Sequence, residues 1–101
     1  MNYADTKAMA LSIIEQIHED YGVDIVSGGG ERYTSDLRKM YCTYMHRNTR
    51  MTMQNISDIL GKSVGNISYA ISMHDKKMGE SSGYADNYTD FQDIIKESAT
   101  I

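Results

Sequence analysis

Apolar residues recur along the chain at spacings of three and four, and this pattern predicts amphipathic helices rather than strands. In the first segment the stripe consists of Ala10, Ile14, Ile17 and Tyr21, widened by Met9 and Ile13. Asn2 or Asp5 can cap the start of this helix, and Gly22 is placed to end it. The first helix is therefore expected to end at about residue 21.

Three further helices are predicted between residues 34 and 78. The second opens at Thr34 or Ser35, and the third follows Thr52. The fourth is capped by Ser63 and runs to Met78. Their inward apolar residues are Leu37, Met40, Tyr41, Tyr44 and Met45 in the second helix, Met53, Ile56, Ile59 and Leu60 in the third, and Val64, Ile67, Ala70 and Ile71 in the fourth.

Three segments read as connections. Residues 23–26 are too short for an independent strand and are expected to fix the first connection to the core. Residues 27–30, Ser-Gly-Gly-Gly, are predicted to be the most flexible loop. Residues 79–87 are polar, contain Gly and Ser, and are also predicted to be a loop.

A final helix is predicted at about residues 88–98. Thr89 and Gln92 have the spacing of a capping box, in which each side chain bonds the other residue's backbone. The inward residues of this acidic helix are Phe91, Ile94 and Ile95. The chain of 101 residues is thus expected to form a single all-α domain, residues 1–101, with about five helices.

The charge is distributed unevenly along the chain. The net charge is −4, which by itself argues against a nucleic-acid partner. Residues 32–78, however, hold eight Lys and Arg against three Asp, a net charge of +5. The two ends hold two Lys against eleven acidic residues, a net charge of −9. A basic centre can meet phosphate although the whole chain is acidic.

Residues 52–73 have the spacing of a helix-turn-helix. Such a motif needs a small residue in its first helix, and Ser57 stands there. Four positions later it needs a residue that tolerates a positive φ, and Gly61 stands there. Six positions further on it needs a buried branched residue, and Ile67 stands there. By spacing alone, a helical hairpin that only packs is an equally good interpretation.

The exposed side of the fourth helix favours DNA binding. Its residues are small, polar or hydrogen-bonding, as expected of a surface that enters a major groove. The residues predicted to face base edges are Ser63, Gly65, Asn66 and Tyr69. Asn66 is the best candidate for reading adenine, and Tyr69 for packing on a sugar or a thymine methyl group.

The chain resembles the C-terminal DNA-binding domain of the bacterial replication initiator DnaA, a Trp-repressor-like helical domain. The resemblance covers most of the chain. It lies in residues 14–21, in the Arg-Lys-Met-Tyr-Cys-Thr-Tyr segment of residues 38–44, in the helix-turn-helix of residues 52–71 and in the closing segment of residues 88–98. It implies a stand-alone replication-initiator-like or regulatory protein, similar to accessory proteins of phages and mobile elements, that binds double-stranded DNA.

The resemblance also implies contacts to the DNA backbone. Arg38 and Lys39 correspond to the family's Arg-Gln pair, and a cation at a helix start is disfavoured unless an anion lies nearby. Lys62 keeps the charge of the family's turn arginine, and Arg32 is what remains of its basic loop. These four residues are the predicted phosphate or minor-groove contacts. For Lys62 and Arg32 the alternative is an exposed, solvated charge.

A second hypothesis belongs to a different class of function. The family's Arg-Asp-His-Thr-Thr signature is replaced here by Lys62-Ser63-Val64-Gly65-Asn66. A protein-interaction module that kept the fold and lost DNA binding would explain this replacement, with a protein partner at the acidic termini. Convergence of the basic residues on one face would favour DNA, and their dispersal would favour the second hypothesis.

Other classes of function find little support in the sequence. Cys42 and His46 lie four apart on one helix, but two ligands make a poor metal site, and a small buried thiol is the better interpretation of Cys42. There is no nucleophile–base pair and no nucleotide loop, so no enzyme activity, catalytic residue, metal or cofactor is predicted. One Cys and no apolar run long enough to cross a bilayer indicate a cytoplasmic protein without a membrane partner.

Overall fold

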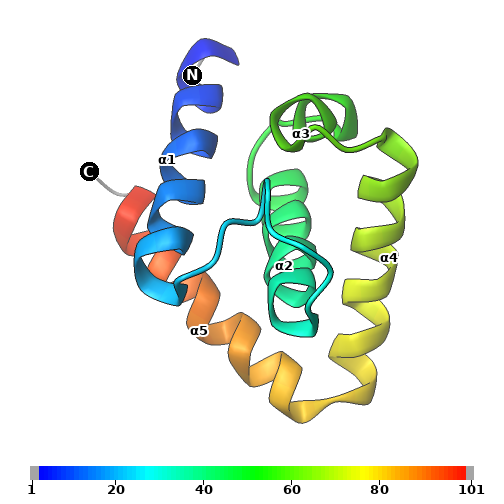
Figure 1. The fold of residues 1–101 in the computed structure, drawn as a ribbon. Coiled ribbons are helices and arrows are strands. Elements are labelled where there is room, and N and C mark those ends of the chain that lie inside the picture. Colours follow the sequence, from blue (N-terminus) through cyan, green and yellow to red (C-terminus); the bar gives the residue numbers. More distant parts are fainter. Residues whose placement is uncertain (1–2, 100–101) are drawn as a thin grey trace.

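A computed structural model describes residues 3–99, which form five helices and, within that range, no strand. The helices are α1 (Tyr3–Tyr21), α2 (Arg32–Asn48), α3 (Met53–Leu60), α4 (Val64–Glu80) and α5 (Ser82–Ala99) (Figure 1). The all-α fold class is confirmed. Asn2, one of the two caps predicted for the first helix, lies outside the described residues, and Asp5 lies in the first turn of α1.

The central helix is α2. It packs against α3, α4 and α5, whereas α1 packs mainly against α5 and lies on the side of α2 away from α4 (Figure 1). The Tyr41 hydroxyl of α2 donates a hydrogen bond of 3.0 Å to the carbonyl of Ala10 in α1. All five inward residues predicted for α2 are buried. Val64, predicted to be inward on α4, is instead 38% exposed, because it stands in the first turn of that helix, at the turn after α3.

The connection between α1 and α2 is held in place rather than loose. Ile25 is fully buried, as expected of a residue that fixes the connection to the core. The Asp24 carboxylate accepts backbone hydrogen bonds from Val26 and Ser27 at 2.9 and 3.1 Å, and these bonds lower its pKa. A Cβ atom at Gly28 would lie 2.3 Å from the Asp24 carbonyl oxygen, so this position requires glycine.

Side-chain caps define both sides of the turn between α3 and α4. Thr52 and Asn55 form a capping box at the start of α3, and the Ser63 hydroxyl accepts a hydrogen bond of 3.2 Å from the backbone N–H of Asn66. Between them Gly61 adopts the left-handed conformation, with φ +66°, and its N–H donates to the carbonyl of Ser57 at 2.9 Å. These hydrogen bonds and the conformation of Gly61 therefore fix how α4 follows α3.

A Gly61→Ala substitution should lower the free energy of unfolding by roughly 1–2 kcal/mol, because a Cβ atom strains the left-handed conformation. No atom lies within 4 Å of the added Cβ, so backbone strain is the only expected cause. Urea unfolding measures the effect. Gly79→Ala is the matched control, because Gly79 lies within α4 and its added Cβ also meets nothing. This substitution should raise the free energy of unfolding by up to about 1 kcal/mol. Equal effects at the two positions would contradict this explanation.

Two helix starts differ from the prediction, and α4 ends at Glu80 rather than at Met78. Helix α2 begins at Arg32, two residues before Thr34, and Thr34 is buried instead of capping the helix. Arg38 and Lys39 therefore lie in the second turn of α2 and not at its start, so the expected unfavourable interaction with the helix dipole does not apply to them. Helix α5 begins at Ser82, so the predicted loop over residues 79–87 is wrong. The Ser81 hydroxyl accepts a hydrogen bond from the Tyr84 N–H at 3.1 Å and caps this earlier start.

The capping box predicted at Thr89 is also wrong. Thr89 lies inside α5, where its hydroxyl donates to the carbonyl of Ala85 at 3.2 Å. The C-terminal helix therefore spans residues 82–99 rather than about 88–98. The physical reason is tertiary: α5 buries an aromatic and aliphatic stripe that extends toward its start. The stripe consists of Tyr84, Tyr88, Phe91 and Ile95, at spacings of four, three and four.

A buried histidine lies where α4 packs against α5. His74 is 1% exposed, and its Nδ1 shares a hydrogen bond of 2.7 Å with the hydroxyl of Tyr84. Its ring also lies 4.4 Å, centroid to centroid, from that of Tyr88. Burial lowers the pKa of His74, an effect that Asp75 opposes and Arg47 reinforces. The imidazole is therefore neutral in the folded protein near neutral pH.

Stability should fall as the pH drops below about 6.5. The unfolded chain binds a proton at His74 at a higher pH than the folded protein does, so acid favours unfolding. Urea unfolding at pH 7.5 and pH 5.5 measures the difference. A His74→Gln variant should show a smaller difference, and an unchanged difference in this variant would assign the effect to other groups.

Candidate nucleic-acid interface

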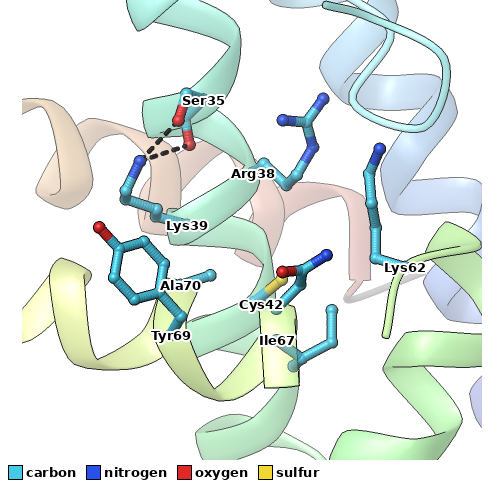
Figure 2. Close-up of a pocket in the computed structure, with 9 residues that line it drawn as sticks. Ser35, Arg38, Lys39, Cys42, Lys62, Ile67, Tyr69 and Ala70 are labelled. Atoms are coloured by element: carbon cyan, nitrogen blue, oxygen red, sulfur yellow. Dashed lines mark hydrogen bonds between the residues drawn. The ribbon is translucent and has the colours of Figure 1, made fainter. Parts of the chain in front are cut away.

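A hollow of about 260 Å³ lies on the surface between α2 and α4 (Figure 2). We call this surface the basic hollow. Its lining residues are Ser35, Arg38, Lys39, Cys42, Lys62, Asn66, Ile67, Tyr69 and Ala70. Three of these are cations and none is acidic. Helix α2 supplies two of the cations and the turn before α4 supplies the third, so the packing of α4 on α2 creates the cluster.

Lys39 is held inside the basic hollow. Its ammonium group donates a hydrogen bond of 2.6 Å to the Ser35 hydroxyl, one helical turn earlier (Figure 2). Burial lowers the pKa of Lys39, and Lys77 and Arg38 lower it further, while Asp36 acts in the opposite direction. Burial therefore disfavours the charged form of Lys39, and an anion seated in the hollow would stabilise that form.

Arg38 ties the basic hollow to the connection between α1 and α2. Its Nε donates to the carbonyl of Ile25 at 2.8 Å, and its Nη2 donates to the carbonyl of Gly28 at 2.9 Å. These bonds cross 13 and 10 residues of sequence. Arg38 thus lines the basic hollow and also holds the connection between α1 and α2 in place.

Lys62 follows the left-handed Gly61 and lies close to Arg38 at the edge of the basic hollow (Figure 2). Its backbone is fixed on both sides. The Lys62 N–H donates to the Ser57 carbonyl at 3.2 Å, and the Ser57 hydroxyl donates to the Lys62 carbonyl. Ser57 is buried, in agreement with the need for a small residue in the first helix of the motif.

The outward side of α4 adjoins the basic hollow. Ser63, Gly65 and Asn66 are exposed at its start, and Tyr69 is 63% exposed one turn later. Ile67, the predicted buried branched residue, is 1% exposed. Asn66 and Tyr69 also line the hollow, so the residues predicted to face base edges stand next to those predicted to hold phosphates.

Arg32 does not line the basic hollow. It lines a second hollow of about 480 Å³, where the start of α2 meets the end of α4 and the start of α5. That hollow also holds an ion pair of 2.7 Å between Lys77 and Asp36. The structure therefore brings together three of the four predicted phosphate contacts, Arg38, Lys39 and Lys62, and places Arg32 at another hollow.

Ser35 and Cys42 are members of the basic hollow that sequence analysis did not assign to a site. Ser35 stands four residues before Lys39, a spacing that places two helical side chains together and could have indicated the bond. Cys42 is fully buried at the base of the hollow, and burial raises the pKa of its thiol to about 12. This confirms the small buried thiol. Among the described residues, no three potential metal ligands come together.

Comparisons with known proteins give no relative for this chain. No family model, no curated protein and no solved structure matches it. Within residues 3–99, no helix has the length and apolar character needed to cross a membrane.

Proposed function

We propose that the protein binds double-stranded DNA as a helix-turn-helix protein. In this proposal α3, the turn at Gly61 and α4 form the motif, and the first turns of α4 enter the major groove. The protein would act as a stand-alone replication-initiator-like or regulatory protein. The observation that carries the proposal is the basic hollow, where three cations and no acidic residue lie beside the exposed start of α4.

The charges at the basic hollow support this proposal over a protein-interaction module. All the residues that line the hollow come from the segment of residues 32–78, which carries +5 although the whole chain carries −4. Arg38, Lys39 and Lys62 converge at it, its lining holds no acidic residue, and burial disfavours the charged form of Lys39. Phosphate groups of a DNA backbone supply the missing negative charge, and contacts to them account for most non-specific affinity.

The surface of α4 supports the orientation. In helix-turn-helix proteins the N-terminal residues of the second helix contact base edges. Here this part of the helix exposes small and hydrogen-bonding side chains next to the cations, while Ile67 and Ala70 bury the opposite side. A helix exposed for solubility alone would more often carry Glu and Lys at these positions.

Fluorescence anisotropy with a mixed-sequence duplex, measured at several salt concentrations, tests the proposal. Contacts from the three cations of the hollow predict a slope of log affinity against log salt of about −3. Absence of binding at about 50 mM salt, where non-specific contacts are strongest, would contradict the proposal. The second hypothesis, a protein partner at the acidic termini, would then be tested by affinity capture.

A further inference from the structure

The outward side of α4 carries no charged side chain between Ser63 and Ser72. This bears on which bases the helix can recognise. Guanine is read chiefly by Arg or Lys, and the amino group of cytosine by Asp or Glu. The first cation on α4 is Lys76, three turns into the helix. Lys62 precedes the helix and lies beside Arg38 at the basic hollow (Figure 2).

The first acidic residue of α4 is committed elsewhere. Asp75 accepts two hydrogen bonds from the guanidinium group of Arg47, at 2.8 and 2.6 Å. This pair joins α2 to α4 and satisfies both oxygens of the carboxylate. The start of α4 therefore offers neither the Arg or Lys that reads guanine nor the Asp or Glu that reads cytosine.

Two side chains at the start of α4 suit an A·T pair. The carboxamide of Asn66 is exposed and has no hydrogen-bond partner among the described residues, while its backbone is fixed by the bond to Ser63. An asparagine in this state can bond N6 and N7 of adenine together. Tyr69 is three residues on, which places it beside Asn66 on the helix surface. Its exposed ring can pack on the methyl group of thymine.

Gly65 keeps the backbone open at the same place. Its φ is not in the left-handed region, and an added Cβ atom would meet only the Ser63 hydroxyl, at 3.8 Å. Nothing within the protein requires glycine there, although glycine weakens a helix. The absence of a side chain at Gly65 would let a base edge approach the helix backbone closely.

From these observations we infer that α4 selects A·T base pairs through the major groove, with Asn66 bonded to adenine and Tyr69 packed on the thymine methyl group. The inference depends on the proposed DNA-binding function and specifies its substrate class. Asn66 and Tyr69 are then the specificity-determining residues, and the basic hollow supplies affinity without sequence preference.

Base analogues test the inference without changing the charge of the DNA. Four duplexes of equal length are compared: one of A·T pairs, the same duplex with uracil for thymine, the same duplex with 7-deazaadenine for adenine, and one of G·C pairs. Uracil lacks only the methyl group, and its duplex should bind about fourfold more weakly, the value of one buried methyl group. The 7-deazaadenine duplex should bind roughly tenfold more weakly, because it lacks N7.

Variants assign each effect to a side chain. Tyr69→Ala should remove the difference between thymine and uracil, and Tyr69→Phe should retain it, since the ring and not the hydroxyl makes the contact. Asn66→Ala should remove the difference between adenine and 7-deazaadenine. Equal binding of the four duplexes, or tightest binding of the G·C duplex, would overturn the inference while leaving DNA binding intact. If none of them binds at about 50 mM salt, the proposed function itself fails.

Gly65 has a matched control in the same chain. Gly83 is the second residue of α5, as Gly65 is of α4, and its added Cβ would likewise meet only the capping serine hydroxyl, Ser81, at 3.8 Å. Alanine at either position should raise the midpoint of urea unfolding. Only Gly65→Ala should also weaken binding to the A·T duplex, by roughly fivefold or more, a typical effect of overpacking. Equal affinity of the two variants would overturn the close approach at Gly65.

Discussion

A variant in which Lys39 and Lys62 are both replaced by glutamine should bind duplex DNA roughly a hundredfold more weakly at about 50 mM salt. Each lysine that contacts a phosphate releases about one counterion, which at this salt concentration is worth roughly tenfold in affinity. The slope of log affinity against log salt should become shallower by about 2. Fluorescence anisotropy over a series of salt concentrations measures both quantities.

The control for this variant removes the same amount of charge elsewhere. Lys7 in α1 and Lys96 in α5 are exposed and do not line the basic hollow, so Lys7→Gln/Lys96→Gln has the same net charge as the test variant. It should keep nearly the affinity of the unaltered protein. An equal loss in both double variants would show that net charge, rather than the hollow, determines binding. Lys39 and Lys62 make no ion pair among the described residues, so their replacement is expected to leave the protein folded. Urea unfolding checks that each variant is folded.

Phe91→Ala should lower the free energy of unfolding by about 4 kcal/mol, a large part of the roughly 5–15 kcal/mol expected of a domain of this size. Phe91 is fully buried in α5, where its ring lies 6.4, 6.2 and 6.1 Å from those of Tyr21, Tyr44 and Tyr88. These partners come from α1, α2 and α5, so truncation leaves a cavity that three helices share. Urea unfolding followed by circular dichroism measures the loss.

Tyr33→Ala is the control for the effect of burial. Tyr33 is also aromatic and also lies beside Tyr21, at 6.3 Å between ring centroids, but it is 52% exposed. Its truncation should lower the free energy of unfolding by less than about 1 kcal/mol. Comparable losses in the two variants would contradict the assignment of Phe91 to the centre of the core.

The elements that the sequence predicts well are those with local signals. Thr52, Ser63 and Gly61 define α3 and α4 by capping chemistry that acts over a few residues, and the structure retains it. The start of α5 has no such agreement between local and tertiary signals. Its first residues are small and polar and are typical of a loop, yet burial of Tyr84 and Tyr88 extends the helix to Ser82. Tyr84 and Tyr88 continue the apolar stripe of Phe91 and Ile95, but the small and polar residues around them indicate a loop.

The candidate site is predictable in its composition but not in its arrangement. A basic central segment predicts that Arg32, Arg38, Lys39 and Lys62 are available, but only the packing of α4 on α2 decides which of them meet. The two hydrogen bonds from Arg38 to backbone carbonyls depend on the path of the connection between α1 and α2. Every residue has a backbone carbonyl, so the sequence does not indicate which of them Arg38 will reach. Convergence of charge is therefore a property of the fold.

The thiol of Cys42 gives the molecule a chemical reporter at a useful place. It is the one cysteine of the chain, and it lies at the base of the hollow between α2 and α4 with its reactivity suppressed by burial. A thiol reagent can reach it only when the two helices separate locally. The labelling rate of the unaltered protein therefore measures how often these helices open, and a molecule seated over the hollow should slow that rate.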